Sequence, residues 1–192
     1  MLKNVTSTLG RRLKMTSPCD AESFLYFSYG SNMSTERIRV ANPSAQVVGP
    51  ALLEDYFLDF NFYSKRWHGA PATITADTSS QVFGVLWCLN LKHLASLDDQ
   101  EGVPSKIYRR FRVEVTPLNE DGSKVSAFIY QLLPERCTST GDAKLPSKAY
   151  MKVILKGAKE HKLPQFYIRD KLEKIRHNGY DGVVDLNVPA RK

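Results

Sequence analysis

The longest apolar run in this chain, Val82–Leu89, is of β-strand length and is interrupted by Gly84. A helix that spans a bilayer needs about 20 consecutive apolar residues, so the sequence excludes a membrane-spanning protein and predicts no membrane partner. A short apolar run without alternation is typical of a strand that is buried on both faces. The chain must therefore build a core that covers this strand from two sides.

Composition places the chain among ordinary globular proteins. It has 192 residues, of which 42% are apolar and 24% are charged, enough for one domain with a sizeable core. The net charge of +7 suits an anionic small molecule or a nucleic acid equally well. The densest basic cluster, Arg109–Arg112, lies in an alternating strand pattern, which indicates an ordinary solvated face and no nucleic-acid partner.

The two ends of the chain differ from its middle. Residues 1–22 are rich in Ser and Thr and show no periodic apolar face, so we expect a flexible N-terminal extension before a domain of residues 23–182. Residues 183–192 are expected to be a loose C-terminal tail. The basic, acid-free start also resembles a mitochondrial presequence. A cytoplasmic location is the main expectation, and a mitochondrial one is the alternative.

The patterns along the domain predict an α+β fold with mainly antiparallel strands. The aromatic run Phe24–Tyr29 predicts a buried strand. Gly102 predicts the end of a helix that begins after Asn90. The other expected elements are strands at 51–60, 71–76, 82–89, 107–116 and 124–133, and helices from Ser34, from about residue 148 and from Pro164.

Cysteine and histidine spacing gives no sign of a metal site or a disulfide framework. The three cysteines, Cys19, Cys88 and Cys137, form no C-x-x-C pair, and the four histidines form no i, i+4 pair. We therefore expect reduced thiols and no metal. Nucleotide-binding glycine motifs and the G-x-S-x-G elbow of hydrolases are also lacking, so the expected chemistry uses no cofactor.

Two segments remain as candidates for chemistry. The loop Tyr29–Met33 follows a buried strand, and its small residues could present backbone N–H groups to a carboxylate or an oxyanion. Leu97–Gly102 gathers three acids at a helix C-terminus, where crowded like charges raise the pKa of a carboxyl. Taken alone, the first segment is better explained as an ordinary strand–helix turn, and the second as a solvated acidic helix end.

Together, Tyr-Gly-Ser-Asn-Met and Leu-Asp-Asp-Gln-Glu-Gly resemble the γ-glutamylcyclotransferase family over roughly residues 23–182. Asn32 stands where glutathione-specific and γ-glutamylamine cyclotransferases carry Leu. The resemblance implies a barrel-like sheet flanked by helices, a homodimer and no cofactor. It further implies a small γ-glutamyl substrate, whose α-amino group attacks its own γ-carbonyl to give 5-oxoproline and a free amino acid.

The resemblance also implies a role for each candidate residue. Glu101 matches the catalytic glutamate that moves the proton, and Tyr150 matches a substrate contact on a late helix. Tyr108 and Tyr130 are either pocket walls or core aromatics, and Asn32 is a possible pocket residue. The implied substrate-binding loop comprises Tyr26, Phe27, Ser28, Tyr29, Gly30 and Ser31. The alternatives are a cyclotransferase for γ-glutamylamines or glutathione, and a non-catalytic binding module of the same fold.

Overall fold

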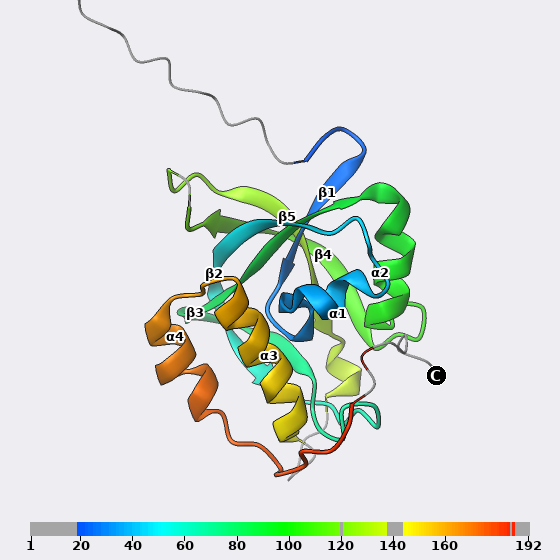
Figure 1. Ribbon diagram of the computed structural model, residues 1–192, viewed down its shortest axis with the longest axis vertical. Coiled ribbons are helices and arrows are strands. Elements are labelled where there is room, and N and C mark those ends of the chain that lie inside the picture. Colours follow the sequence, from blue (N-terminus) through cyan, green and yellow to red (C-terminus); the bar gives the residue numbers. More distant parts are fainter. Residues whose placement is uncertain (1–18, 120, 138–143, 185, 187–192) are drawn as a thin grey trace, which may run out of the picture.

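The computed structural model describes residues 19–119, 121–137, 144–184 and 186, and its centre is a closed five-stranded barrel (Figure 1). The strand order around the barrel is β1-β3-β2-β4-β5. All pairings are antiparallel except the short parallel one between β1 and β5 that closes the ring. The strands are β1 (Ser23–Ser28), β2 (Gln46–Phe60), β3 (Ala72–Asn90), β4 (Tyr108–Pro117) and β5 (Val125–Leu132). The expected α+β class with a mainly antiparallel, barrel-like sheet is confirmed.

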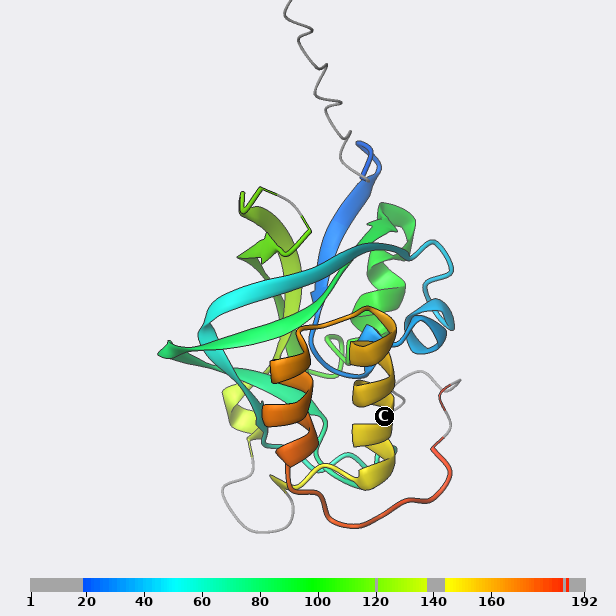
Figure 2. The ribbon, with the colours of Figure 1, turned by 60° about the vertical axis from the view of Figure 1, so that its left-hand side comes forward.

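Helices occupy the connections between the strands and the C-terminal part of the domain. Helices α3 and α4 lie side by side outside the barrel (Figure 2). The helices are α1 (Thr35–Arg39), α2 (Leu94–Glu101), α3 (Lys148–Glu160) and α4 (Gln165–Asp170). Short 3-10 turns are η1 (Ser31–Met33), η2 (Leu91–His93), η3 (Pro134–Arg136) and η5 (Leu172–Lys174). Within the described ranges, no helix combines the length and apolar character needed to cross a bilayer.

The sequence predicted two strands where the structure has one. Residues 71–76 and 82–89 were expected to be separate strands, because the polar segment between them looks like a loop. In the structure β3 runs through this segment, and it pairs with β2 on both sides of a register shift between Glu54 and Tyr56. The polar residues form a solvent-facing bend in a continuous strand. Val82–Leu89 is buried throughout, as the apolar run predicted.

The helix expected from Pro164 is also shorter than predicted. It ends at Asp170, and Leu172, which was expected on the same helical face, lies in the separate turn η5. Ile168 and Leu172 are nevertheless both buried, so the apolar periodicity correctly marked the inward face.

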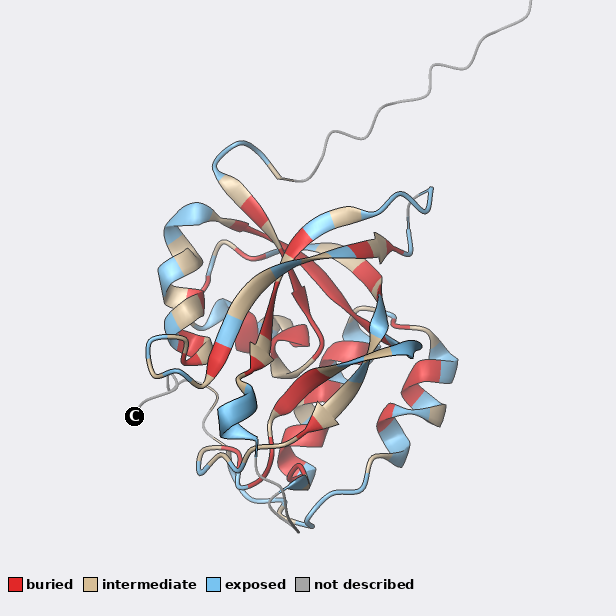
Figure 3. Ribbon diagram, turned by 180° about the vertical axis from the view of Figure 1, so that it is seen from behind, coloured by how far each residue is buried: buried red, intermediate tan, exposed pale blue. Residues whose placement is uncertain are grey.

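The core fills the barrel and the space beneath α3 (Figure 3). Phe27 and Trp87, on the paired strands β1 and β3, are fully buried. Gly157 lets α3 lie directly against η1, because a Cβ atom there would be 2.5 Å from the Met33 carbonyl carbon and from the Ser34 nitrogen. This contact fixes the position of the loop that follows β1.

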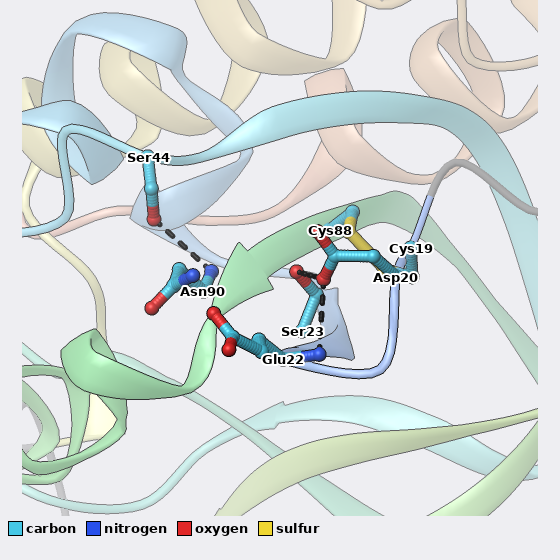
Figure 4. Close-up of a disulfide and its surroundings, with 7 residues drawn as sticks. All are labelled: Cys19, Asp20, Glu22, Ser23, Ser44, Cys88 and Asn90. Carbon is cyan, nitrogen blue, oxygen red and sulfur yellow. Dashed lines mark hydrogen bonds between the residues drawn. A yellow bond between two sulfur atoms is a disulfide. The ribbon is translucent and has the colours of Figure 1, made fainter.

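A disulfide joins Cys19 to Cys88, so the expectation of reduced thiols was wrong for this pair (Figure 4). The sequence separation of 69 residues conceals the proximity. In the β1–β3 ladder Cys88 pairs with Leu25, and the turn before Ser23, where the Ser23 N–H donates to the Asp20 carbonyl, brings Cys19 back to Cys88. Cys137 is the free cysteine of the described part of the chain, and it is exposed.

The last four residues of the expected N-terminal extension are therefore attached to the barrel. Asp20 accepts hydrogen bonds from the Glu22 N–H and from the Ser23 hydroxyl, and the Glu22 carbonyl accepts from the Leu91 N–H at 2.7 Å. Residues 1–18, which carry the presequence alternative, and residues 187–192 of the expected tail lie outside the described residues.

We predict that the disulfide stabilises the domain by constraining its unfolded chain. Cys19→Ser should lower the free energy of unfolding by about 2–4 kcal/mol under non-reducing conditions. Thermal unfolding with and without dithiothreitol measures this effect. Cys137→Ser is the matched control and should keep the wild-type response to reductant. A wild-type melting temperature that does not change on reduction would contradict the prediction.

Candidate active site

Glu101 is the last residue of α2, and the turn that follows it requires glycine. Gly102 has φ of 71° and donates its N–H to the carbonyls of Asp98 and Asp99, which is the C-cap that the sequence predicted. A Cβ atom at Gly102 would lie 3.0 Å from the Ile107 side chain, so another residue would add contact as well as backbone strain. The sharp end of α2 leaves the Glu101 carboxyl beside the loop after β1.

The two segments that the sequence singled out meet at this carboxyl. The Asn32 amide nitrogen Nδ2 donates to Glu101 Oε1 at 2.7 Å, across 69 residues of sequence. The Tyr26 hydroxyl donates to the same oxygen at 3.4 Å, and Asn32 Nδ2 is 3.3 Å from that hydroxyl. The end of β1, the turn η1 and the end of α2 therefore form one site.

This site opens into a cavity of about 480 Å³, a size suited to a small-molecule ligand. Most of the residues predicted from the sequence line it. They are Tyr26, Tyr29, Gly30, Ser31, Asn32, Glu101, Tyr108, Tyr130 and Tyr150. The rest of the lining comes from Arg37, Gln100, Ile107, Pro71, Ala72 and the loop segment 62–67 between β2 and β3.

The side chains of Phe27 and Ser28 lie in the barrel core and outside this lining. Phe27 is fully buried. The Ser28 hydroxyl accepts from Trp87 Nε1 at 3.0 Å and donates to the Val85 carbonyl. A contribution of these two residues to ligand binding would therefore come from their backbone.

Three tyrosines hold the cavity wall through their hydroxyl groups. The Tyr150 hydroxyl accepts from the Ala72 N–H at 3.0 Å, and the Tyr108 hydroxyl donates to the Ala72 carbonyl at 2.7 Å. The Tyr130 hydroxyl donates to Asp98 Oδ1 at 2.7 Å. Tyr108 and Tyr130 are thus buried aromatics and cavity residues at the same time, so the two alternatives that the sequence left open do not exclude each other.

Burial raises the pKa of the Glu101 carboxyl to about 7, against the opposing effects of Arg37, the Tyr26 hydroxyl and Arg66. The charge of Asp98 adds a smaller upward effect. Crowding among the acids of α2 was the cause expected from the sequence, but removal from water is the main one. A carboxyl that titrates near neutral pH can both accept and return a proton under physiological conditions.

Sequence reasoning missed Arg37, Gln100 and the 62–67 segment. Arg37 is on the short helix α1, and no sequence signal distinguishes it from a solvent-exposed arginine. It is instead 3% exposed and lies beside the cavity. The alternating strand pattern also gave no sign that Arg110 forms an ion pair with Asp98 at 2.5 Å. Through Asp98 this pair supports the Tyr130 hydroxyl.

In the described part of the chain, no three His, Cys, Asp or Glu side chains are grouped so that they could hold a metal ion. The polar groups at the cavity include the carboxyl of Glu101, amides, tyrosine and serine hydroxyls and cationic side chains. Such a set can bind a polar, zwitterionic molecule and transfer protons to and from it.

Comparisons with known proteins identify the family of this chain. The AIG2-like family model matches residues 81–171. The chain is 43% identical to a bovine protein named gamma-glutamylcyclotransferase, over 88% of this chain and 87% of the relative. It is 41% identical to the human protein of that name, over 91% and 89%. The chain belongs to the gamma-glutamylcyclotransferase family.

A solved structure of a gamma-glutamyl cyclotransferase has the same fold. It superposes with a TM-score of 0.78 at 41% identity and covers 85% of this chain and 94% of its own. The family resemblance carried by the two sequence motifs is therefore confirmed, together with the fold it implied.

We predict that the buried carboxyl makes stability depend on pH in a defined direction. Because folding raises the pKa of Glu101, the folded state binds more protons than the unfolded state between about pH 4.5 and 7. The contribution of Glu101 to stability is therefore present at low pH and is lost as the pH rises through 7. Glu101→Gln should melt roughly 2–6 °C above wild type at pH 8, and the difference should shrink toward pH 5.

Thermal unfolding from pH 5 to 8 measures this dependence. Asp99→Asn removes an exposed carboxyl from the same helix and should not show the same trend. A Glu101→Gln variant that is less stable than wild type at pH 8 would show that the carboxylate is a net stabilising group.

Proposed function

We propose that the protein converts γ-glutamyl amino acids into 5-oxoproline and a free amino acid, with Glu101 as the group that moves the proton. The observation that carries the proposal is the Glu101 carboxyl itself, which is held at the cavity by Asn32 and Tyr26 and titrates near neutral pH. Relatives that are 41–43% identical and bear the name gamma-glutamylcyclotransferase support the same reaction.

The reaction needs positioning and proton transfer. A γ-glutamyl amino acid contains its own nucleophile, because its α-amino group can reach the γ-carbonyl in a five-membered ring. Holding the two groups together can supply effective molarities of about 10⁵ M or more. The amine is protonated in solution and must lose a proton before it has a lone pair for attack.

Glu101 is assigned the proton transfers. Its carboxylate takes a proton from the α-ammonium group, and the free amine attacks the γ-carbonyl carbon to give a tetrahedral intermediate. The ring nitrogen of this intermediate still carries one proton more than it has in 5-oxoproline. The carboxylic acid donates its proton to the leaving nitrogen as the bond from the γ-carbon to that nitrogen breaks. The carboxylate formed again then takes the extra proton from the ring nitrogen and passes it to the released amine, which leaves as an ammonium group. The products are 5-oxoproline and an amino acid, and Glu101 is again a carboxylate.

The loop Tyr29–Ser31 is assigned the binding of the γ-glutamyl group through its backbone N–H groups. Its support is the position of these residues on the cavity wall, next to Glu101 and against α3. Tyr150 is assigned a substrate contact directly beside this loop, because its hydroxyl lies 3.0 Å from where a Gly30 Cβ atom would be. Any side chain at residue 30 would crowd this part of the cavity.

Glutathione and γ-glutamylamines are the second candidate substrates. The hydrogen bond from Asn32 to Glu101 favours the first assignment, because Leu, which the related cyclotransferases carry at this position, cannot make it. A non-catalytic binding module is disfavoured by a carboxyl whose pKa is tuned to about 7 within a formed cavity.

A role in glutathione metabolism, a homodimer and a cytoplasmic location remain predictions from the family resemblance. The Cys19–Cys88 disulfide bears on the last of these, because such bonds are rare in a reducing cytosol. Non-reducing gels of protein from fractionated cells would relate the oxidation state of this pair to the compartment.

We predict that Glu101→Gln abolishes measurable release of 5-oxoproline. Glutamine keeps the size of glutamate but cannot take the substrate proton, and positioned acid–base groups contribute about 10²–10⁴ in rate. The measurement is 5-oxoproline release from γ-glutamyl-alanine, glutathione and γ-glutamyl-lysine, each tested separately. Wild type should prefer γ-glutamyl-alanine to glutathione.

Asp99→Asn is the matched control, since it makes the same chemical change two residues away at an exposed position. It should keep most of the activity. Asp98 is less suitable as a control because it contacts Tyr130 and Arg110. Near wild-type turnover by Glu101→Gln would refute the proposed mechanism.

A further inference from the structure

A buried row of polar side chains leads from Glu101 to a cation that the proposed mechanism does not use. Asn32, Gln100 and Arg37 are each 5% exposed or less. Asn32 contacts the Glu101 carboxyl, Gln100 contacts Asn32, and Arg37 contacts Gln100. Each amide in the row can donate through its nitrogen or accept through its oxygen. The orientation of one amide therefore decides whether the next group must accept or donate a hydrogen bond.

In one orientation of the row, Asn32 stabilises the ionised form of Glu101. Asn32 Nδ2 then donates to Glu101 Oε1, and Gln100 Nε2 donates to Asn32 Oδ1, both at 2.7 Å. The same Gln100 nitrogen lies 3.0 Å from Nη1 and from Nη2 of Arg37. A guanidinium has only donors, so three donor groups face one another in a buried place, which is unfavourable.

Turning the Gln100 amide removes this conflict. Its oxygen then accepts from both Arg37 nitrogens at 3.0 Å. Its nitrogen faces Asn42, whose buried Oδ1 lacks a hydrogen-bond partner among the described residues and can turn to accept from it. The turn of Asn42 gives up a long bond of 3.3 Å from Nδ2 to the Ile38 carbonyl and leaves Oδ1 facing that carbonyl at the same distance.

The turned Gln100 forces a change at Asn32 and then at Glu101. Its oxygen would face Asn32 Oδ1 at 2.7 Å, so Asn32 must turn to present its nitrogen. Asn32 Oδ1 then takes the place of Nδ2, 2.7 Å from Glu101 Oε1. Two oxygens at that distance need a proton between them, and a protonated Glu101 supplies it.

We propose that Asn32 is a positioning residue whose amide turns with the protonation of Glu101, and that Arg37 acts through Gln100 to favour the protonated form. Asn32 presents Nδ2 to the carboxylate that receives the substrate proton and Oδ1 to the carboxylic acid that returns it. Both states of the base are therefore hydrogen-bonded within the buried site. The inference deepens the proposed function and rests on the role assigned there to Glu101.

Other groups act on the same carboxyl from every neighbouring element. The direct charge of Arg37 lowers the pKa of Glu101, opposite to the effect proposed through Gln100. Arg66 from the loop before β3 and the Tyr26 hydroxyl from β1 also lower it, and Asp98 from α2 raises it. The hydroxyls of Tyr29, Tyr108, Tyr130 and Tyr150 are all within electrostatic reach of Glu101. The contribution of Gln100 must therefore be isolated by a change that leaves these groups in place.

Gln100→Met is that change, and the direction of its effect is decisive. Methionine keeps the length of glutamine but neither accepts from Arg37 nor directs Asn32, so Asn32 is free to donate to the carboxylate. The pKa of Glu101 should fall by about 0.5–1. If Gln100 only held Asn32 in its donating orientation, or if the added apolar surface dominated, the pKa would rise.

The pKa is read from the carboxyl carbon of Glu101 by NMR in protein labelled with ¹³C at glutamate, with Glu101→Gln used to assign the signal. A fall in Gln100→Met, with no change in the control Gln131→Met on β5, supports the proposal. A rise or an unchanged value overturns it. This titration does not depend on turnover, so it remains interpretable if Glu101→Gln proves active and the proposed function fails.

A second measurement on the unmodified protein guards against a Gln100→Met variant that fails to fold. The side-chain ¹⁵N–¹H signals of Gln100, which does not bond to Glu101, should titrate with the Glu101 midpoint. They should not titrate in Glu101→Gln. Gln100 signals that stay constant from pH 5 to 9 while Glu101 titrates would overturn the proposal.

Discussion

The hydrogen bond from Asn32 Nδ2 to Glu101 Oε1 is the contact on which the site depends. It joins a turn at the end of β1 to the last residue of α2. A glycine fixes the position of each partner. Gly157 lets α3 press against η1, and Gly102 ends α2 at Glu101. The turn η1 follows β1, and α2 follows β3 by way of η2, so the two elements emerge from paired strands of the barrel.

The reactivity of this contact comes from opposing effects on one carboxyl. Burial makes the charged form of Glu101 costly, while Arg37, Arg66 and the Tyr26 hydroxyl favour it. With burial alone, the carboxyl would hold its proton too firmly to act as a base. With the cations alone, it would be too weak a base to accept a proton from an ammonium group. The balance near neutral pH suits a group that must do both in one catalytic cycle.

The sequence predicted those parts of the fold and site that depend on local pattern. Phe24–Tyr29 and Val82–Leu89 carry enough apolar character to mark buried strands, and Gly102 marks a helix end. The roles of Glu101 and of the Tyr26–Ser31 loop came from the family resemblance, because the local pattern alone favoured an ordinary turn for the loop and a solvated acidic helix end for the segment of Glu101.

What the sequence could not supply depends on contacts between distant segments. The Cys19–Cys88 disulfide depends on the β1–β3 register and on the turn before Ser23, and no cysteine spacing reveals it. Arg37 lies on a helix of five residues, too short for a periodic pattern to show that it faces inward. The bend that keeps β3 continuous depends on its pairing with β2, so the polar residues 77–81 read as a loop in isolation.

The most direct test of the central claim is the pH dependence of kcat/KM for wild-type protein with γ-glutamyl-alanine. If Glu101 must be ionised to take the substrate proton, log kcat/KM should rise with a slope of one up to a midpoint near pH 7, where burial places the pKa of the free enzyme. Constant kcat/KM between pH 5.5 and 8 would contradict the account, because no group titrating near neutrality would then control the reaction.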